Sequence, residues 1–186
     1  MRDVLEIDTD RLVLRRPEAA DATRVACFLA DHGVSRMVAS VPHPYPKSAA
    51  DGWLMLLRAR RGLGHDHVFA VELAGEGLIG MIGAHRQDGG GHEVGYWIGR
   101  PYWGEGFATE ALRGFVAEAQ SLGELEAGHF VDNPASGRVL EKAGFVYTGE
   151  VARRFSMARG ETVGSRRMRF APKPARKRPH AQACAA

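Results

Sequence analysis

The chain has 186 residues, of which 45% are hydrophobic and 25% charged, an ordinary composition for a soluble globular protein. No apolar stretch approaches the roughly 20 residues of a membrane span. The first residues lack the apolar region of a secretory leader, and two cysteines predict neither a disulfide framework nor a metal site. We therefore expect a cytoplasmic protein with no metal and no membrane partner.

The net charge of +3 comes from the C-terminal end of the chain. Four of the 25 basic residues, and no acidic residue, lie in 171–186, which leaves 21 bases against 22 acids in the remainder. A nearly neutral body gives no reason to expect a nucleic-acid partner. We expect residues 1–170 to form a single domain and 171–186, which contain few large apolar groups, to form a disordered basic tail.

The N-terminal third predicts one strand and two helices. The strand covers about Leu12–Arg16, and a helix covers about Ala22–Ala30, with Asp21 as its cap. Prolines at 42, 44 and 46 exclude a helix in that segment. Ser48, followed three residues later by Asp51, resembles a capping box and predicts a second helix behind it.

The rest of the chain alternates strands with helices. Apolar residues recur at helical spacing after Gly106, and Asn133 or Asp132 precedes a second such segment that closes at Gly144. The expected strands are 67–73, 78–85, about 94–98, 127–131, 145–155 and 162–170. The order β-α-α-β-β-β-α-β-α-β-β predicts a mixed sheet with helices on both faces.

The turn Gly104-Glu105-Gly106 joins a buried strand to a helix. A helix N-terminus has free amides and a partial positive charge, so such a turn can bind an anion. A tight strand-to-helix turn with no ligand is an equally good interpretation of this stretch alone. A Walker loop is excluded because no Gly-Lys-Ser/Thr follows, and the third glycine of a dinucleotide fingerprint is missing.

Three separated segments carry a family resemblance: Asp10–Arg15 with Val41–Tyr45, Glu93–Ile98 with Trp103–Ala111, and Asp132–Phe145. Together they resemble the GNAT superfamily of acyl-CoA-dependent N-acyltransferases, in particular its RimJ/RimL-type branch, named for enzymes that acetylate ribosomal-protein N-termini. The resemblance implies an α/β (α+β) fold with a mixed seven-stranded sheet, and acetyl-CoA as the donor. A homodimer is compatible with it.

The resemblance also implies where the donor binds. The family's Arg/Gln-x-x-Gly-x-Gly/Ala loop corresponds to Trp103–Ala108, with Trp103 in place of the arginine or glutamine. The strand through Ile98 is expected to splay from its neighbour near residue 131, so that the pantetheine arm pairs with its backbone. The implied cofactor contacts are Ile98, Trp103, Gly104, Glu105, Gly106, Phe107, Ala108, Thr109, Asn133 and Ser136.

Acetyl transfer to an amine needs a proton acceptor and a proton for the leaving thiolate. The family often places a glutamate in the strand before the loop, which makes Glu93 the candidate base. By strand alternation Glu93 shares a face with Gly95 and Trp97. The alternative is that Glu93 is structural and pairs with an arginine or with loop amides.

The proton donor is less well defined by the sequence. Relatives carry a tyrosine where this chain has Leu140, so Ser136 is the candidate acid, as suggested for the RimL-type branch. Ser136 could equally be a first-turn serine that bonds only to backbone, and the CoA thiol is acidic enough to leave without an acid. His129, beside the expected splay, is a further candidate to approach the thioester.

We therefore predict an acetyl-CoA-dependent N-acetyltransferase that acts on a protein N-terminal α-amine or a small-molecule amine. Residues 32–47 and the closing hairpin are expected to form the acceptor side. Hairpin arginines, including Arg154, Arg159 and Arg167, would suit an acidic acceptor or would simply form a solvated face. The alternative function is a non-catalytic acyl-CoA-binding or partner-binding module.

Overall fold

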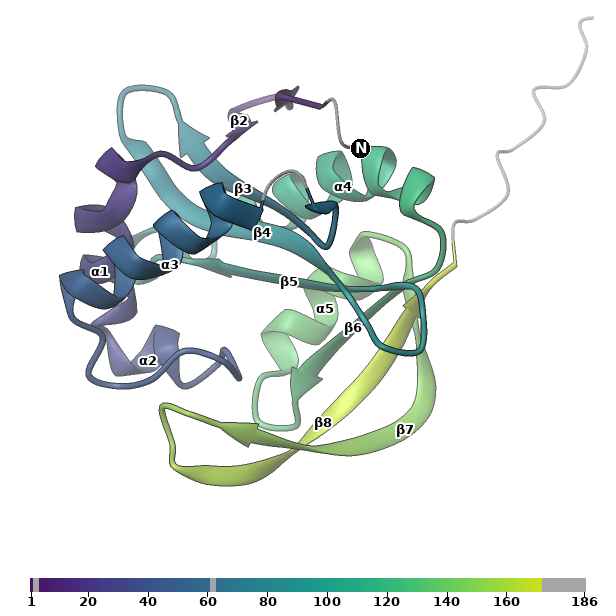
Figure 1. The fold of residues 1–186 in the computed structure, drawn as a ribbon. Coiled ribbons are helices and arrows are strands. Elements are labelled where there is room, and N and C mark those ends of the chain that lie inside the picture. The colour runs from purple at the N-terminus through teal and green to yellow at the C-terminus, as the bar shows by residue number, and fades with distance from the viewer. Residues whose placement is uncertain (2–3, 61–62, 172–186) are drawn as a thin grey trace, which may run out of the picture.

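The computed structural model describes residues 1, 4–60 and 63–171, and it contains one mixed eight-stranded sheet in the order β1-β2-β3-β4-β5-β6-β8-β7 (Figure 1). Every neighbouring pair is antiparallel except β5 and β6, which are parallel. The strands are β1 (Glu6–Asp8), β2 (Leu12–Arg15), β3 (Asp66–Leu73), β4 (Gly77–Arg86), β5 (His92–Ile98), β6 (Leu125–Phe130), β7 (Phe145–Ser156) and β8 (Glu161–Phe170).

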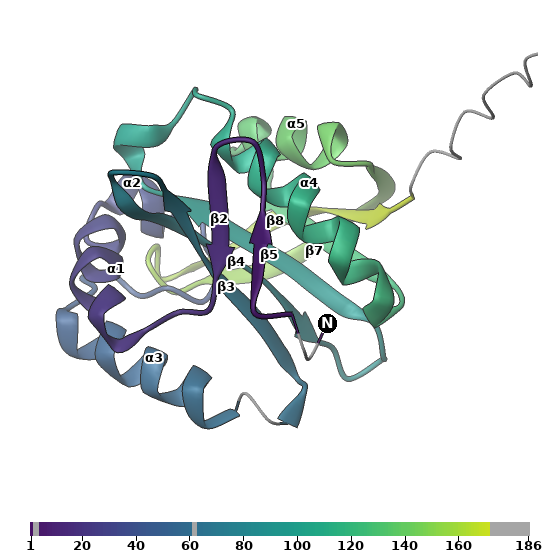
Figure 2. The same cartoon turned by 90° about the horizontal axis from the view of Figure 1, so that it is seen from above.

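Helices cover both faces of this sheet, as predicted (Figure 2). Helices α1 and α3 pack on one face and α4 and α5 on the other. Strand β3 shows why two cores form: Phe69 and Val71 point toward α4, whereas Val68 and Ala70 point toward α1 and α3. The helices are α1 (Ala22–Leu29), α2 (His32–Ser35), α3 (Lys47–Arg60), α4 (Phe107–Ala119) and α5 (Pro134–Lys142).

One strand, β1, and one short helix, α2, were not predicted. The expected count of seven strands was therefore too low by one. Strand β1 has three residues and a single buried side chain, Ile7, too short for a period-two pattern to be visible. Helix α2 is a single turn that the Asp31 side chain caps by accepting a hydrogen bond from the Gly33 amide at 2.7 Å. Both elements depend on their neighbours more than on their own sequence.

The predicted caps in the N-terminal third do not form the expected side-chain caps. Asp21 does occupy the N-cap position of α1, but its carboxylate accepts from the Glu18 amide at 2.8 Å and pairs with Arg15, so it makes no cap hydrogen bond to α1. Helix α3 begins at Lys47, ahead of the proposed cap Ser48, and the Lys47 ammonium bonds to Asp51 at 2.8 Å. In each case a nearby cation competes for the carboxylate, which sequence spacing alone does not reveal.

The expected splay between strands is confirmed. Strands β5 and β6 pair only from His92 to Val94, opposite Leu125 to Ala127. Beyond that point β5 stays paired with β4, and β6 with β8, so the two strands separate (Figure 1). Residues 95–98 of β5 therefore present an edge without a strand partner on the β6 side.

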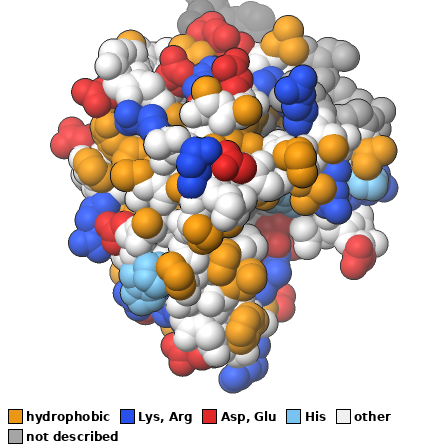
Figure 3. Space-filling model, turned by 60° about the vertical axis from the view of Figure 1, so that its left-hand side comes forward, with side chains coloured by type: hydrophobic (Ala, Val, Ile, Leu, Met, Phe, Trp, Pro, Cys, Tyr) orange, Lys and Arg blue, Asp and Glu red, His pale blue; other side chains and the backbone are white. Residues whose placement is uncertain are grey.

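The surface over α1, α2 and α3 carries hydrophobic side chains with single basic and acidic groups among them (Figure 3). No helix in the described ranges is long and apolar enough to span a membrane. The proposed basic tail lies outside the described residues, except for Ala171.

Candidate active site

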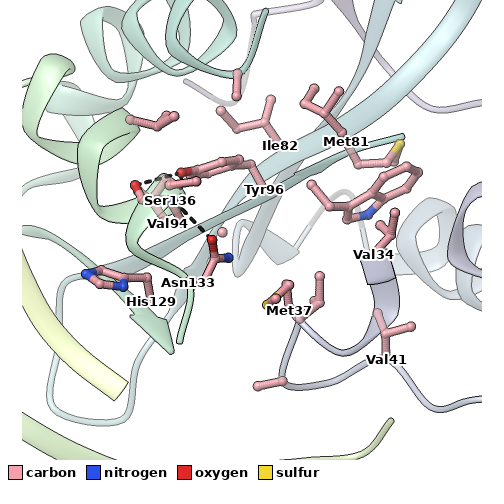
Figure 4. Close-up of a pocket in the computed structure, with 18 of the residues that line it drawn as sticks. Val34, Met37, Val41, Met81, Ile82, Val94, Tyr96, His129, Asn133 and Ser136 are labelled. Carbon is pink, nitrogen blue, oxygen red and sulfur yellow. Dashed lines mark hydrogen bonds between the residues drawn. The ribbon is translucent and has the colours of Figure 1, made fainter. Parts of the chain in front are cut away.

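A cavity of about 700 Å³ opens where β5 and β6 separate. Its walls come from β4, β5, the turn before α4, the start of α5, and the segment between α2 and α3. In Figure 4, Tyr96, Ser136, Asn133 and His129 lie on one side of the cavity. Val34, Met37, Val41 and Met81 lie on the other side (Figure 4). One continuous cavity thus joins a polar half to an apolar half.

The turn before α4 is built for close approach of a ligand to the main chain. Gly104 and Gly106 have φ values of 88° and 83°, in the left-handed region that side chains disfavour. Within the described chain, the amides of residues 104–108 donate to no acceptor, whereas the Thr109 amide bonds back to the Gly106 carbonyl at 3.0 Å. We call residues 104–108 the donor turn, because the family resemblance places the acyl-CoA donor there. The donor turn offers up to five free amides beside the positive end of a 13-residue helix.

Trp103 bridges the end of β5 and this turn. Its indole Nε1 donates to the Ile98 carbonyl at 2.6 Å, and 47% of the residue stays exposed. All the residues predicted to bind the donor line the cavity except Glu105. The Glu105 carbonyl instead accepts from Arg11 at 3.1 Å.

Two cations on α5 were not singled out from the sequence. Arg138 and Lys142 are four residues apart, so they lie on one face of the helix, and both line the cavity. Neither side chain forms an ion pair with another described residue. Their i, i+4 spacing behind the Asn133 cap was the signal available in the sequence.

Glu93 lines the cavity at the base of the splay, and its carboxylate has two arginine partners. Arg154 Nη2 lies 2.8 Å from each carboxylate oxygen, and Arg167 also donates to Oε1. A carboxylate offers about four lone-pair sites, so three contacts leave one, on Oε2. The register of β5 with β4 is unbroken from His92 to Ile98, which keeps Glu93 on the same face as Trp97.

Ser136 forms a hydroxyl pair that sequence analysis missed. Its Oγ lies 2.8 Å from the Tyr96 hydroxyl, which also bonds to the Ser136 carbonyl at 3.2 Å. Burial raises the pKa of Tyr96 to about 12, so the phenol stays protonated at neutral pH. Asn133 caps α5 by accepting from the Ser136 amide at 3.2 Å (Figure 4).

His129 and three arginines of the closing hairpin are held by internal partners. His129 bonds through Nδ1 to the Phe130 carbonyl at 2.9 Å and through Nε2 to the Tyr147 hydroxyl at 3.0 Å, so neither ring nitrogen is free to reach a thioester. Arg159 forms a two-pronged pair with Asp132, and its hydrogen bonds lower the pKa of that carboxyl. Arg154, Arg159 and Arg167 therefore do not form an open basic face.

Known proteins show the same sequence and fold patterns. The chain is 32% identical over 155 residues to the uncharacterized N-acetyltransferase YoaA of Bacillus subtilis (strain 168), covering 77% of this chain and 84% of YoaA. Mycobacterium smegmatis RimJ, solved with CoA-disulfide, shares the fold with a TM-score of 0.77 at 21% identity, covering 89% of this chain and 86% of RimJ. RimL, solved with coenzyme A, gives a TM-score of 0.76 at 13% identity, covering 88% and 96%.

A family match covers most of the chain. Residues 11–146 match the acetyltransferase (GNAT) domain, a span that begins at β2 and includes the splay, the donor turn and α5. Enzymes of this family take their acetyl group from acetyl-CoA. The match and the relative YoaA together establish that the chain belongs to the GNAT family of acetyltransferases.

Proposed function

We propose that this enzyme transfers the acetyl group of acetyl-CoA to the nitrogen of a primary amine, either a protein N-terminal α-amine or a small-molecule amine. The observation that supports this most strongly is the single cavity. It joins the unpaired edge of β5 and the free amides of the donor turn to Glu93 and Ser136.

The donor fits the polar half of the cavity. The edge at residues 95–98 offers backbone groups that can pair with the pantetheine amides as an added strand would. The amides of 104–108 can hold the pyrophosphate, and Arg138 and Lys142 can neutralise its charge. Trp103, where the family pattern has arginine or glutamine, leaves these main-chain donors intact.

In the proposed reaction the amine nitrogen attacks the thioester carbonyl, the N–C bond forms and the C–S bond breaks. Glu93 accepts the amine proton through a water at its remaining lone pair on Oε2. The Ser136 hydroxyl hydrogen-bonds the departing sulfur, and Tyr96 holds Ser136 in position. This base suits an α-amine, which costs about 1.1 kcal/mol to deprotonate at pH 7, better than a lysine at about 4.6 kcal/mol.

A second function rests on one observation, the occupancy of Glu93 by two arginines. If no lone pair is available to an amine, the protein binds acyl-CoA without turnover and acts as a binding module. The two functions make opposite predictions about turnover and the same prediction about CoA binding.

Thiol release from acetyl-CoA, measured with a panel of peptides and small amines beside direct calorimetry of CoA binding, separates them. We expect amine-dependent thiol release and one acetylated product per thiol. CoA binding with no release for any acceptor would establish the module instead. Absence of CoA binding would refute both.

A further inference from the structure

The half of the cavity opposite Ser136 has apolar walls (Figure 4). It is lined by Val34, Met37, Val41, Trp53, Met81 and Trp97, which come from α2, the segment after it, α3, β4 and β5. Several of these side chains belong to the core that α1 and α3 form with the sheet. Figure 4 shows Val34, Met37, Val41 and Met81 facing the cavity from the side opposite Ser136. These walls are therefore continuous with a packed core and do not form a loose surface patch.

The charged groups near these walls are paired with one another. Asp132 is held by Arg36 at 2.8 Å and by Arg159, and Arg100 pairs with Asp31 at 2.7 Å. Arg154, the one arginine of the closing hairpin that lines the cavity, is bound to Glu93. Among the described lining residues of this half, no charged side chain is left to meet an acidic or basic group on the acceptor.

Tyr45 adds a polar group to this apolar wall. The residue lines the cavity with 8% of its surface exposed, and its hydroxyl has no hydrogen-bond partner within the described ranges. The hydroxyl can therefore bond to a single polar group of a ligand in the cavity. An acceptor with a small side chain, such as serine or alanine at the first position of a peptide, would leave the apolar walls uncovered.

We propose that the acceptor carries a large apolar group, aromatic or branched aliphatic, next to its primary amine, and that this group fills the apolar half of the cavity. The inference rests on the proposed function, because it identifies the acceptor of the same reaction. It applies equally to an arylalkylamine and to a peptide whose first residue has a large apolar side chain. Burial of that side chain provides the affinity, and Glu93, the proposed proton acceptor, lines the same cavity.

Matched acceptors test the inference. We expect kcat/KM for 2-phenylethylamine to exceed that for ethanolamine by about tenfold or more, the usual size of discrimination by an apolar pocket. The same ratio is expected for two peptides identical except for Phe or Ser at the first position. A preference for the apolar member in only one of the two pairs also supports the inference, and it shows whether the acceptor is a small amine or a peptide. Equal or better use of ethanolamine and the Ser peptide overturns the inference while the N-acetyltransferase stands.

Filling the pocket provides a second test. Val38 lines the cavity and is only partly buried, so Val38→Trp should fold and occupy the space. We expect it to lower the ratio of kcat/KM for 2-phenylethylamine to kcat/KM for ethanolamine by about tenfold, with CoA affinity retained. Val146→Trp, on exposed β7 outside the cavity, is the control and should match the wild type. A Val38→Trp enzyme that uses 2-phenylethylamine as well as the control does overturns the inference.

Binding separates failure of the inference from failure of the proposed function. Calorimetry of the CoA-loaded protein measures 2-phenylethylamine binding without any turnover. Binding that Val38→Trp abolishes, without acetylation of any amine, supports the apolar ligand and refutes the transferase function. Neither binding nor acetylation refutes both.

Discussion

Under the proposed function, the two halves of the cavity recognise their ligands by different means. The donor half would use main-chain amides around Gly104 and two cations of α5 that form no ion pair with a described residue. The acceptor half would use apolar side chains from four separate elements, and its neighbouring charges are neutralised by partners within the protein. A donor common to the whole family can be held by backbone geometry, whereas the choice of acceptor depends on side chains.

The largest expected effect comes from the proposed proton acceptor. Glu93→Gln removes its carboxylate but keeps the shape of the side chain, so kcat should fall by about a hundredfold, the low end for general-base loss. CoA affinity should not change, because the donor turn is untouched. Steady-state thiol release and calorimetry of CoA measure the two quantities.

Glu126→Gln is the matched control for this variant. Glu126 pairs with Arg167, as Glu93 does, but it does not line the cavity. If both variants lose the same activity, the effect is due to the arginine network and Glu93 is structural. If neither loses activity, Glu93 is not the base.

A substitution that strains the backbone at Gly106 tests the donor half alone. Gly106→Val places a β-branched residue at a φ of 83°, a strain of about 1–3 kcal/mol, so the turn should change shape and the Kd for CoA should rise about tenfold or more. Gly149→Val has the same kind of strain, at a φ of 89°, on β7 outside the cavity. It should lower stability without changing the Kd; an equal loss of CoA affinity in both variants would show that the Gly106 effect is not local.

A smaller effect is expected when one positive charge is removed from the donor half. Arg138→Ala should raise the Kd for CoA about fivefold at low salt, and the difference should shrink as salt screens the phosphates. Binding of an apolar amine to the CoA-loaded variant should be unaffected. Arg153→Ala, on the exposed hairpin and outside the cavity, is the control. A salt-independent effect would mean that Arg138 acts by packing and not by charge.

The smallest expected effect concerns β5, the strand that both halves share. Burial, with the nearby Arg86 charge, lowers the pKa of His92 in the folded protein below its ordinary value of 6.5. Above about pH 6.5 the imidazole is neutral in both the folded and the unfolded chain, so its titration does not reduce the free energy of unfolding. Below it the unfolded chain binds a proton that the folded protein does not, so the free energy of unfolding decreases as pH falls toward the folded pKa.

Urea unfolding at a series of pH values measures this effect. Between about pH 6.5 and 5, the free energy of unfolding of His92→Gln should decline less steeply than that of the wild type, because the variant lacks the titrating group. Parallel curves for His92→Gln and wild type would contradict the assignment.

The turn and the helices of the donor half could be predicted from the sequence because their signals are local, whereas the assignment of the donor to them came from the family resemblance. Two glycines and a helical pattern within a few residues were enough to identify the turn, and Asn133 with Pro134 identified the start of α5. The register of β5 placed Glu93 and Trp97 on one face, as alternation predicted. These features need only neighbours along the chain.

The remaining features depend on contacts between distant segments. The arginines that bind Glu93 lie 61 and 74 residues away along the chain, on β7 and β8. The Tyr96–Ser136 pair joins residues 40 apart, and the apolar wall gathers α2, α3, β4 and β5. Such contacts arise from packing, so the sequence alone could identify the candidates but not the partners that determine their roles.

Amide hydrogen exchange tests the division of the cavity most directly, with three samples: the free protein, the CoA complex, and the complex with 2-phenylethylamine. The expected result is that CoA slows exchange at residues 95–98 and 104–108, and that the amine adds protection only around residues 34–41. If CoA leaves 104–108 unprotected, or if the amine protects the donor turn and not residues 34–41, the account of two chemically distinct halves is wrong.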